Sequence, residues 1–201
     1  MKTPHGDSVT AGRFHVIRYN RHMKIGVISD THDRLDGIDS AVKIFADSKV
    51  DMVVHCGDWV ATFTFDYFVQ KLAPLKVPIR AVLGNNDTEL ARRRAARATS
   101  GGNVELSPKS VFEFEADGRR IAVYHGQDPS VLSALIECKK YDAVFSGHTH
   151  TVRNERVHDV LVLNPGTTCF IQSLRILDEG SVAIYDSDTN TATIVTFDRQ
   201  R

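Results

Sequence analysis

The sequence of 201 residues predicts an α/β fold with parallel strand pairing in its first half. Two patterns carry this prediction. The first half repeats strand, helix and strand, an order that favours parallel strands joined by helical crossovers. The second half consists mainly of short apolar strands separated by turn-forming residues. Polar residues also stand directly after most of the predicted core strands, which points to a functional site at the strand ends.

The first half alternates buried strands with amphipathic helices. Apolar residues at Leu35, Ile38, Ala41 and Phe45 have the spacing of a helix with one buried face. Pro74 ends a second helical stretch, because proline lacks a backbone N–H. In chain order we predict strand Lys24–Ser29, helix Leu35–Ser48, strand Met52–Val54, helix Phe63–Leu72 and strand Ile79–Leu83.

Turn signals organise the second half. Asp117-Gly118 separates two apolar runs and predicts a β-hairpin with a tight turn. The polar stretch Ser187–Asn190 predicts a second hairpin that closes the domain. The strands expected in this half are Val111–Phe114, Arg119–Tyr124, Ala143–Phe145, Val160–Leu163, Val182–Tyr185 and Ala192–Phe197.

Composition and length restrict the classes of partner. The 25 basic and 25 acidic residues cancel, so no net charge attracts the chain to nucleic acid, and no stable complex with it is expected. The sequence contains no apolar run long enough to cross a membrane. Its three cysteines form neither a disulfide framework nor a CxxC metal site, which favours the cytoplasm. A monomer and a homodimer both remain open.

Residues 1–22 are predicted to be an extension that precedes a single domain at residues 23–201. The segment lacks sustained periodicity, and Met23 stands directly before the first clear strand. Its histidines, His5, His15 and His22, are interpreted as part of a flexible basic tail. Deleting this segment is expected to leave the stability of the domain unchanged.

Metal-binding residue types follow nearly every predicted core strand. In open α/β sheets, residues at the carboxyl ends of strands converge on one crevice. Asp, His and Asn offer oxygen and nitrogen ligands suited to Mn²⁺, Fe²⁺, Zn²⁺ or Mg²⁺. In Asp30-x-His32 and His148-x-His150, alternation along a strand end is expected to point both side chains the same way. The candidate ligands are Asp30, His32, Asp58, Asn85, His125, His148 and His150.

Seven ligands are too many for one tetrahedral ion and enough for two that share a carboxylate. Asp58 is the natural bridge. The residues therefore predict a site with two divalent ions.

The ordered motifs Asp30-x-His32, Gly57-Asp58, Gly84-Asn85, His125-Gly126 and Gly147-His148-x-His150 resemble those of the calcineurin-like metallophosphoesterases. The resemblance covers Met23 to about Phe197 and is strongest to the small bacterial and archaeal phosphodiesterases. Asn164-Pro165-Gly166-Thr167 is similar to a turn of that branch.

This resemblance implies a sandwich of two facing sheets flanked by helices, with the ions at the strand ends. It also implies hydrolysis of a small-molecule phosphate ester, in which the two ions present a bridging hydroxide to the phosphorus atom and clamp the phosphoryl oxygens. It implies two ligand sets, which share Asp58. The first comprises Asp30, His32, Asp58 and His150, and the second comprises Asp58, Asn85, His125 and His148. Asn86 and His125 are assigned catalytic roles. Mn²⁺ is the first choice of ion, with Ni²⁺, Fe²⁺, Zn²⁺ and Mg²⁺ as alternatives.

One departure from the family pattern bears on chemistry. Many members carry G-N-H-E, whose histidine can protonate the leaving group, whereas this chain has Asn86 and then Asp87. The extended G-D motif of protein phosphatases is also absent, which argues against protein substrates. A phosphodiesterase is the main prediction. The alternatives are a phosphomonoesterase for nucleotides or sugar phosphates and a non-catalytic scaffold like the retromer subunit.

Four further features have a simpler structural interpretation. His55 and Cys56 are expected to pack behind the site, and Trp59 either lines the cleft or packs in the core. Arg92, Arg93, Arg94 and Arg97 are interpreted as a solvated helix face, with phosphate capture as the alternative.

Overall fold

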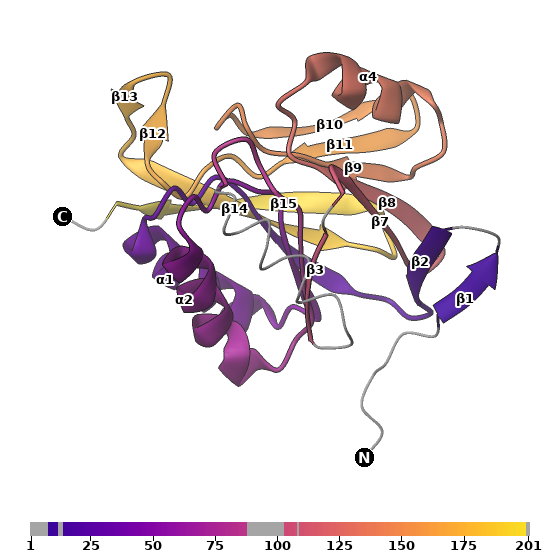
Figure 1. Ribbon diagram of the computed structural model, residues 1–201, viewed down its shortest axis with the longest axis horizontal. Helices are drawn as coiled ribbons and strands as arrows, with labels where there is room; N and C mark the ends of the chain where they lie inside the picture. Colours follow the sequence, from indigo (N-terminus) through magenta and orange to yellow (C-terminus); the bar gives the residue numbers. More distant parts are fainter. Residues whose placement is uncertain (1–7, 12–13, 88–102, 108, 200–201) are drawn as a thin grey trace.

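The computed structural model describes residues 8–11, 14–87, 103–107 and 109–199 (Figure 1). In this part of the chain the strands form two large sheets and one small hairpin. None of the described helices is long and apolar enough to cross a membrane.

The six-stranded sheet contains the strands predicted for the first half and the closing hairpin. Its order is β15 (Thr191–Asp198), β14 (Glu179–Asp186), β3 (Lys24–Ile28), β4 (Met52–His55), β5 (Ile79–Ala81) and β6 (Val104–Leu106). Strands β3, β4 and β5 pair in parallel, as predicted, and β6 adds to β5 in parallel, while β14 pairs antiparallel with β3 and β15. Parallel pairing brings the carboxyl ends of β3, β4 and β5 to one edge.

The seven-stranded sheet contains the strands of the second half and an N-terminal hairpin. Its order is β1 (Ser8–Ala11), β2 (Phe14–Tyr19), β7 (Val111–Ala116), β8 (Arg119–Tyr124), β9 (Ala143–Phe145), β11 (Val160–Asn164) and β10 (Arg153–Val157). The predicted Asp117-Gly118 turn joins β7 to β8, and both of its residues have positive φ angles. Strands β12 (Ile171–Gln172) and β13 (Arg175–Ile176) form the small hairpin.

The layers stack as helix, sheet, sheet, helix. Helices α1 (Leu35–Ser48) and α2 (Thr62–Leu72), with the 3₁₀ turn Ala73–Leu75, lie on the six-stranded sheet, and α4 (Pro129–Glu137) lies on the other (Figure 1). The largest core cluster fills the space between the sheets and includes Ile25 and Val27 of β3 and Phe145 of β9. Alternate residues of β3 face α1 instead, as in a strand buried on both faces. The predicted sandwich is confirmed.

The structure differs from the expectation for residues 1–22. Strand β2 joins the seven-stranded sheet by parallel pairing with β7, and β1 pairs with β2. Tyr19 is buried in the core between the sheets. The sequence did not predict β2, because its partner strand β7 lies nearly a hundred residues away. Local periodicity does not reveal such a partner. The domain boundary at residue 23 stays a prediction.

Several other elements were not predicted. They are β6, α4, β10, β12 and β13. The start of helix α4 has a sequence signal, because Asp128 followed by Pro129 is typical of a helix N-terminus. In the structure the side chain of Asp128 accepts hydrogen bonds from the backbone of Ser130 and Val131.

Candidate metal centre

All seven predicted ligands lie in loops that leave the carboxyl ends of strands. Asp30 and His32 follow β3, Asp58 follows β4, and Asn85 follows β5 in the six-stranded sheet. His125 follows β8, and His148 and His150 follow β9 in the seven-stranded sheet. The candidate centre therefore draws its side chains from both sheets.

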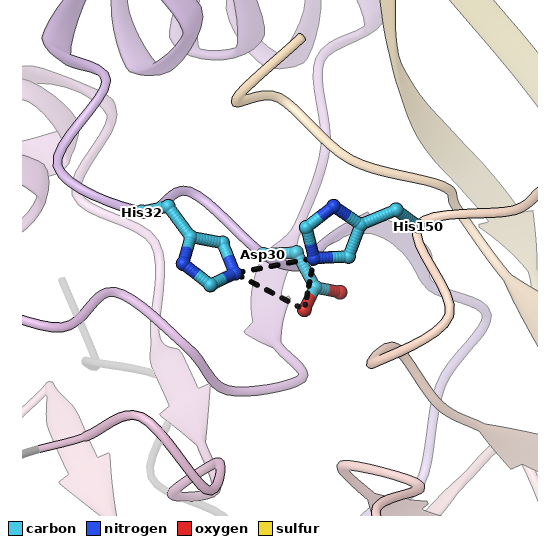
Figure 2. A group of neighbouring side chains, drawn as sticks. All are labelled: Asp30, His32 and His150. Carbon is cyan, nitrogen blue, oxygen red and sulfur yellow. Dashed lines mark hydrogen bonds and ion pairs between the residues drawn. The ribbon is translucent and has the colours of Figure 1, made fainter. Parts of the chain in front are cut away.

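The first ligand set contains a tight group of three side chains. Figure 2 shows the rings of His32 and His150 turned toward the carboxylate of Asp30. The two Nε2 atoms lie 3.2 Å apart. Asp30 Oδ1 lies 3.3 Å from Nε2 of His150 and 3.8 Å from Nε2 of His32. Two nitrogen or oxygen ligands of a tetrahedral ion, each about 2.1 Å from it, are about 3.4 Å apart. These separations fit one shared ion.

Asp30 itself shows that the group fits a cation. The residue is fully buried, and its Oδ2 accepts hydrogen bonds from Ser29 Oγ at 2.6 Å and from the backbone of His148 at 2.9 Å. Its Oδ1 is buried and accepts no hydrogen bond from the described residues. A buried carboxylate oxygen without a hydrogen bond is costly, and a bound ion would satisfy it.

Asp58 faces both ligand sets. Its Oδ2 lies 3.2 Å from Nε2 of His125 and 3.6 Å from Nε2 of His32. His125 Nε2 also lies 3.1 Å from Oδ1 of Asn85. One carboxylate oxygen thus sits between a histidine of the first set and a histidine of the second, which is the geometry that a bridging ligand requires.

Two of the predicted ligands have their rings oriented by backbone carbonyls. His125 Nδ1 lies 2.8 Å from the carbonyl oxygen of Cys56, and His150 Nδ1 contacts that of Ile171. Each contact directs Nε2 of the ring toward the centre. If Nε2 binds a metal, Nδ1 carries the ring proton and donates it to the carbonyl oxygen. His148 lies against His125 with ring centroids 5.2 Å apart, and its side chain is more exposed.

Charge pairing dominates the protonation of the first group. Burial raises the pKa of Asp30, but the neighbouring His150 and His32 outweigh it and hold that pKa well below its usual range. Burial lowers the pKa of His150, yet the contact with Asp30 raises it to about 10. The raised pKa of His150 favours positive charge beside Asp30, where a metal cation would also balance the carboxylate. A divalent ion would compete with a proton for this position.

The ligand loops adopt a backbone that the sequence argument did not foresee. Five of the seven predicted ligands have positive φ angles, and these are Asp30, His32, Asp58, His148 and His150. The expectation that Asp30 and His32 converge by alternation along an extended strand is therefore wrong, because both stand in the left-handed region beyond the strand end. Such backbone strain often concentrates at functional sites.

Two motif glycines are required by close contacts. A Cβ atom at Gly84 would lie 2.0 Å from Oδ1 of Asp58, and one at Gly147 would lie 1.8 Å from Oγ of Ser29. Neither backbone position could accept any other residue without moving the carboxylates of the centre. This is the physical reason for glycine in the G-N and G-H motifs.

A family comparison covers the part of the chain that carries this centre. The profile described as the calcineurin-like phosphoesterase superfamily domain matches residues 23–190. The chain belongs to this superfamily. The resemblance inferred from the five motifs is thereby confirmed.

Relatives within the superfamily include an archaeal phosphodiesterase. A phosphodiesterase of Methanocaldococcus jannaschii is 40% identical over 147 residues, which cover 73% of this chain and 85% of that protein. A solved structure described as a novel archaeal phosphodiesterase has a TM-score of 0.73 and 32% identity, covering 87% of this chain and all of the other. The zinc complex of Vps29 from Entamoeba histolytica covers 88% of this chain and 99% of its own, with a TM-score of 0.54. At 17% identity this last likeness shows the fold alone.

Other residues near the centre take supporting positions. His55 is buried, and burial lowers its pKa to about 3, so its neutral ring accepts a hydrogen bond from the backbone of Gly57 at 3.0 Å. Trp59 is buried against His55 and Phe65 and does not line a cleft. Cys56 packs in the core, as expected. The cluster Arg92, Arg93, Arg94 and Arg97 lies outside the described residues.

Sequence reasoning missed several residues that brace the ligand loops. Thr167 donates its hydroxyl hydrogen to the carbonyl oxygen of Asp30 at 2.8 Å, and Asn164 donates to that of Gly147 at 2.8 Å. Asp33 accepts hydrogen bonds from the backbone of Ala61 and the hydroxyl of Thr64. The N-P-G-T turn was a sequence signal for the first two. No local pattern marked Asp33.

Proposed function

We propose that this protein is a metal-dependent phosphodiesterase that uses two divalent ions bridged by Asp58. The position of Asp58 Oδ2 between His32 and His125 carries the proposal. Membership of the phosphoesterase superfamily and the similarity to an archaeal phosphodiesterase support the reaction class. Because the seven expected ligand positions all keep a competent donor, the non-catalytic scaffold has less support.

When bound, the two ions supply a hydroxide nucleophile and offset the charge that grows on the phosphoryl oxygens. The chain's own residues position that chemistry. Asp30 and Asp58 provide the buried negative charge that retains divalent ions, and the carbonyls of Cys56 and Ile171 orient the His125 and His150 rings. Loops from both sheets converge on the centre, so a substrate phosphate would contact the two ions at this end of the sandwich.

Asn86 and His125 are the catalytic candidates, and Mn²⁺ is the first choice of ion, before Ni²⁺, Fe²⁺, Zn²⁺ and Mg²⁺. The substrate is a small-molecule diester. A cytoplasmic location is supported by the three free cysteines, two of which are buried, since such thiols suit a reducing compartment.

The decisive test compares metal content and activity in three proteins. The parent, Asp58→Ala and His158→Asn are stripped with chelator, reloaded with Mn²⁺ and measured by elemental analysis. His158 is exposed in the turn between β10 and β11 with a φ of 54°, and asparagine tolerates that backbone. We expect two ions per chain in the parent and in His158→Asn. In Asp58→Ala we expect fewer than two ions, with hydrolysis of bis-p-nitrophenyl phosphate lost.

The same proteins distinguish the substrate classes. We expect kcat/KM for the diester to exceed that for p-nitrophenyl phosphate, and the reverse order would identify a phosphomonoesterase. Two ions and full activity in Asp58→Ala would contradict the bridging role. Two ions in the parent without hydrolysis of any ester would favour the scaffold.

A further inference from the structure

Asp87 is a buried carboxylate that the proposed chemistry does not use. The residue is only 5% exposed. Oδ2 accepts hydrogen bonds from the backbone N–H groups of Gly84 at 2.7 Å and Asp58 at 3.0 Å, and Oδ1 accepts one from Val60 at 2.9 Å. Three backbone donors from two separate loops therefore meet on one side chain.

The donors belong to the loops that carry Asp58 and Asn85. Asp58 and Val60 have φ angles of 63° and 76°, a conformation that residues other than glycine rarely adopt and that is especially costly for a β-branched side chain. Hydrogen bonds to Asp87 stabilise this turn by satisfying the buried N–H group of Asp58 and the partly buried one of Val60. The hydrogen bond from Gly84 fixes the backbone at the residue that directly precedes Asn85.

The first ligand set has its own connections. The backbone N–H groups of Asp30 and His32 donate to the carbonyl oxygens of Gly57 and Asp58 at 3.0 and 3.1 Å. These bonds do not involve Asp87, so the loops of Asp30, His32 and Asp58 stay joined to one another without it. Asp87 instead ties this unit to the loop of Asn85.

We propose that Asp87 is a positioning residue that holds the loop of Asn85 against the loop of Asp58, so that the second ligand set binds its ion. This inference depends on the two-ion function proposed above. Asp87→Ala removes all three acceptor contacts. Asp87→Asn keeps the shape, but its NH₂ group must face at least one N–H donor, so at least one bond is lost.

The test is calorimetric titration of metal-free protein with Mn²⁺, which yields a dissociation constant for each ion. We expect the ion of the second set to bind about 10- to 100-fold more weakly in Asp87→Ala, with an intermediate loss in Asp87→Asn. The ion of the first set should change far less, so that the ratio of the two constants widens at least about tenfold. Asn85→Ala, which removes a ligand of the second set, identifies the binding step that belongs to it.

Asp51→Asn is the matched stability control. Asp51 also accepts a backbone hydrogen bond, from Lys24 at 2.9 Å, but it lies where β3 and β4 begin, at the opposite end from the ligand loops. We expect it to lower the melting temperature and leave both dissociation constants unchanged. Electron paramagnetic resonance provides a second readout, since a bridged Mn²⁺ pair and a single Mn²⁺ have different spectra. At one level of added Mn²⁺ the Asp87 variants should show less of the paired signal.

The titration distinguishes failure of the proposed function from failure of the positioning role. If the parent binds a single ion, the proposed function fails. If the parent binds two ions and the Asp87 variants weaken both equally, Asp87 acts through its charge, and the positioning role is overturned. Unchanged constants in Asp87→Asn and Asp87→Ala would overturn it as well. If Asp87→Ala does not fold, Asp87→Asn decides the question by the same ratio.

Discussion

At the scale of single residues, Asn86 departs most clearly from the family pattern. Its backbone N–H donates to Oδ1 of Asp58 at 2.9 Å, and its side-chain amide donates to Oδ2 at 2.7 Å. The side chain therefore lies beside the proposed bridging carboxylate. An amide can donate a hydrogen bond there, but it cannot supply a proton near neutral pH as a histidine can.

This difference predicts how the rate depends on the leaving group. We expect kcat/KM of the parent to fall steeply as the leaving phenol becomes more basic, because the asparagine at position 86 cannot protonate the leaving group. Asn86→His should flatten this dependence and raise the rate of the most basic esters by up to about 10²-fold. The measurement is kcat/KM across aryl phosphate diesters of graded phenol pKa, at matched metal occupancy. Asn86→Ala should keep the steep slope.

Coincident slopes for the parent and Asn86→His would show that position 86 does not face the leaving group. The hydrogen bonds to Asp58 would then be the whole role of Asn86.

At the scale of elements, the N-terminal hairpin extends the superfamily domain. The family match begins at residue 23, yet β2 lies within the seven-stranded sheet. Tyr19 at its end is 7% exposed, and its hydroxyl accepts a hydrogen bond from Nη2 of Arg80 at 2.7 Å. Arg80 belongs to β5 of the other sheet and is itself buried. The hairpin thus contributes a contact between the sheets.

We expect Tyr19→Phe to lower the free energy of unfolding by about 1–2 kcal/mol, because it leaves a buried guanidinium N–H without its acceptor. Deletion of residues 1–22 should cost about 3–5 kcal/mol, as expected for loss of a buried aromatic side chain. Denaturant unfolding of metal-free protein measures both. Tyr67→Phe is the control, since the Tyr67 hydroxyl donates to Asp39 on a partly exposed helix surface, and we expect a smaller loss. A deletion without effect would mean that β2 adds nothing to the core.

At the scale of the whole molecule, the candidate centre connects the two sheets. Asp30 and Asp58 extend from the six-stranded sheet, and His125 and His150 extend from the seven-stranded sheet. Bound ions would therefore join the two halves of the sandwich at one end. An ion that binds only the folded state stabilises it by mass action.

We expect Mn²⁺ at about 100 times its dissociation constant to add about 2.7 kcal/mol to the free energy of unfolding for each ion that binds. In a chain of this size that amounts to about 5–10 °C in melting temperature. Thermal unfolding in chelator and in Mn²⁺ measures the shift. The shift should be much smaller in Asp58→Ala. Equal shifts in the parent and Asp58→Ala would place the stabilising ions elsewhere.

Features that depend only on neighbouring residues could be predicted from the sequence. The bounds of α1 agree with the predicted helix at both ends, because its apolar spacing is a local property. The turn at Asp117-Gly118 was predictable for the same reason, since the two residues tolerate positive φ angles without help from the rest of the fold. The strand-end motifs identified the family and the candidate ligands.

Features that depend on distant partners are visible only in the folded chain. Strand β2 exists because β7 pairs with it, and short strands such as β6 and β10 likewise depend on a neighbour in the sheet. The left-handed backbone at Asp58 and Val60 is held by Asp87, almost thirty residues further along the chain. Hydrogen bonds between loops of this kind leave no periodic pattern, because each is a single contact between side chain and backbone across a large sequence separation. For that reason the sequence indicates which residues could bind metal, and only the folded chain shows which residues hold them in place.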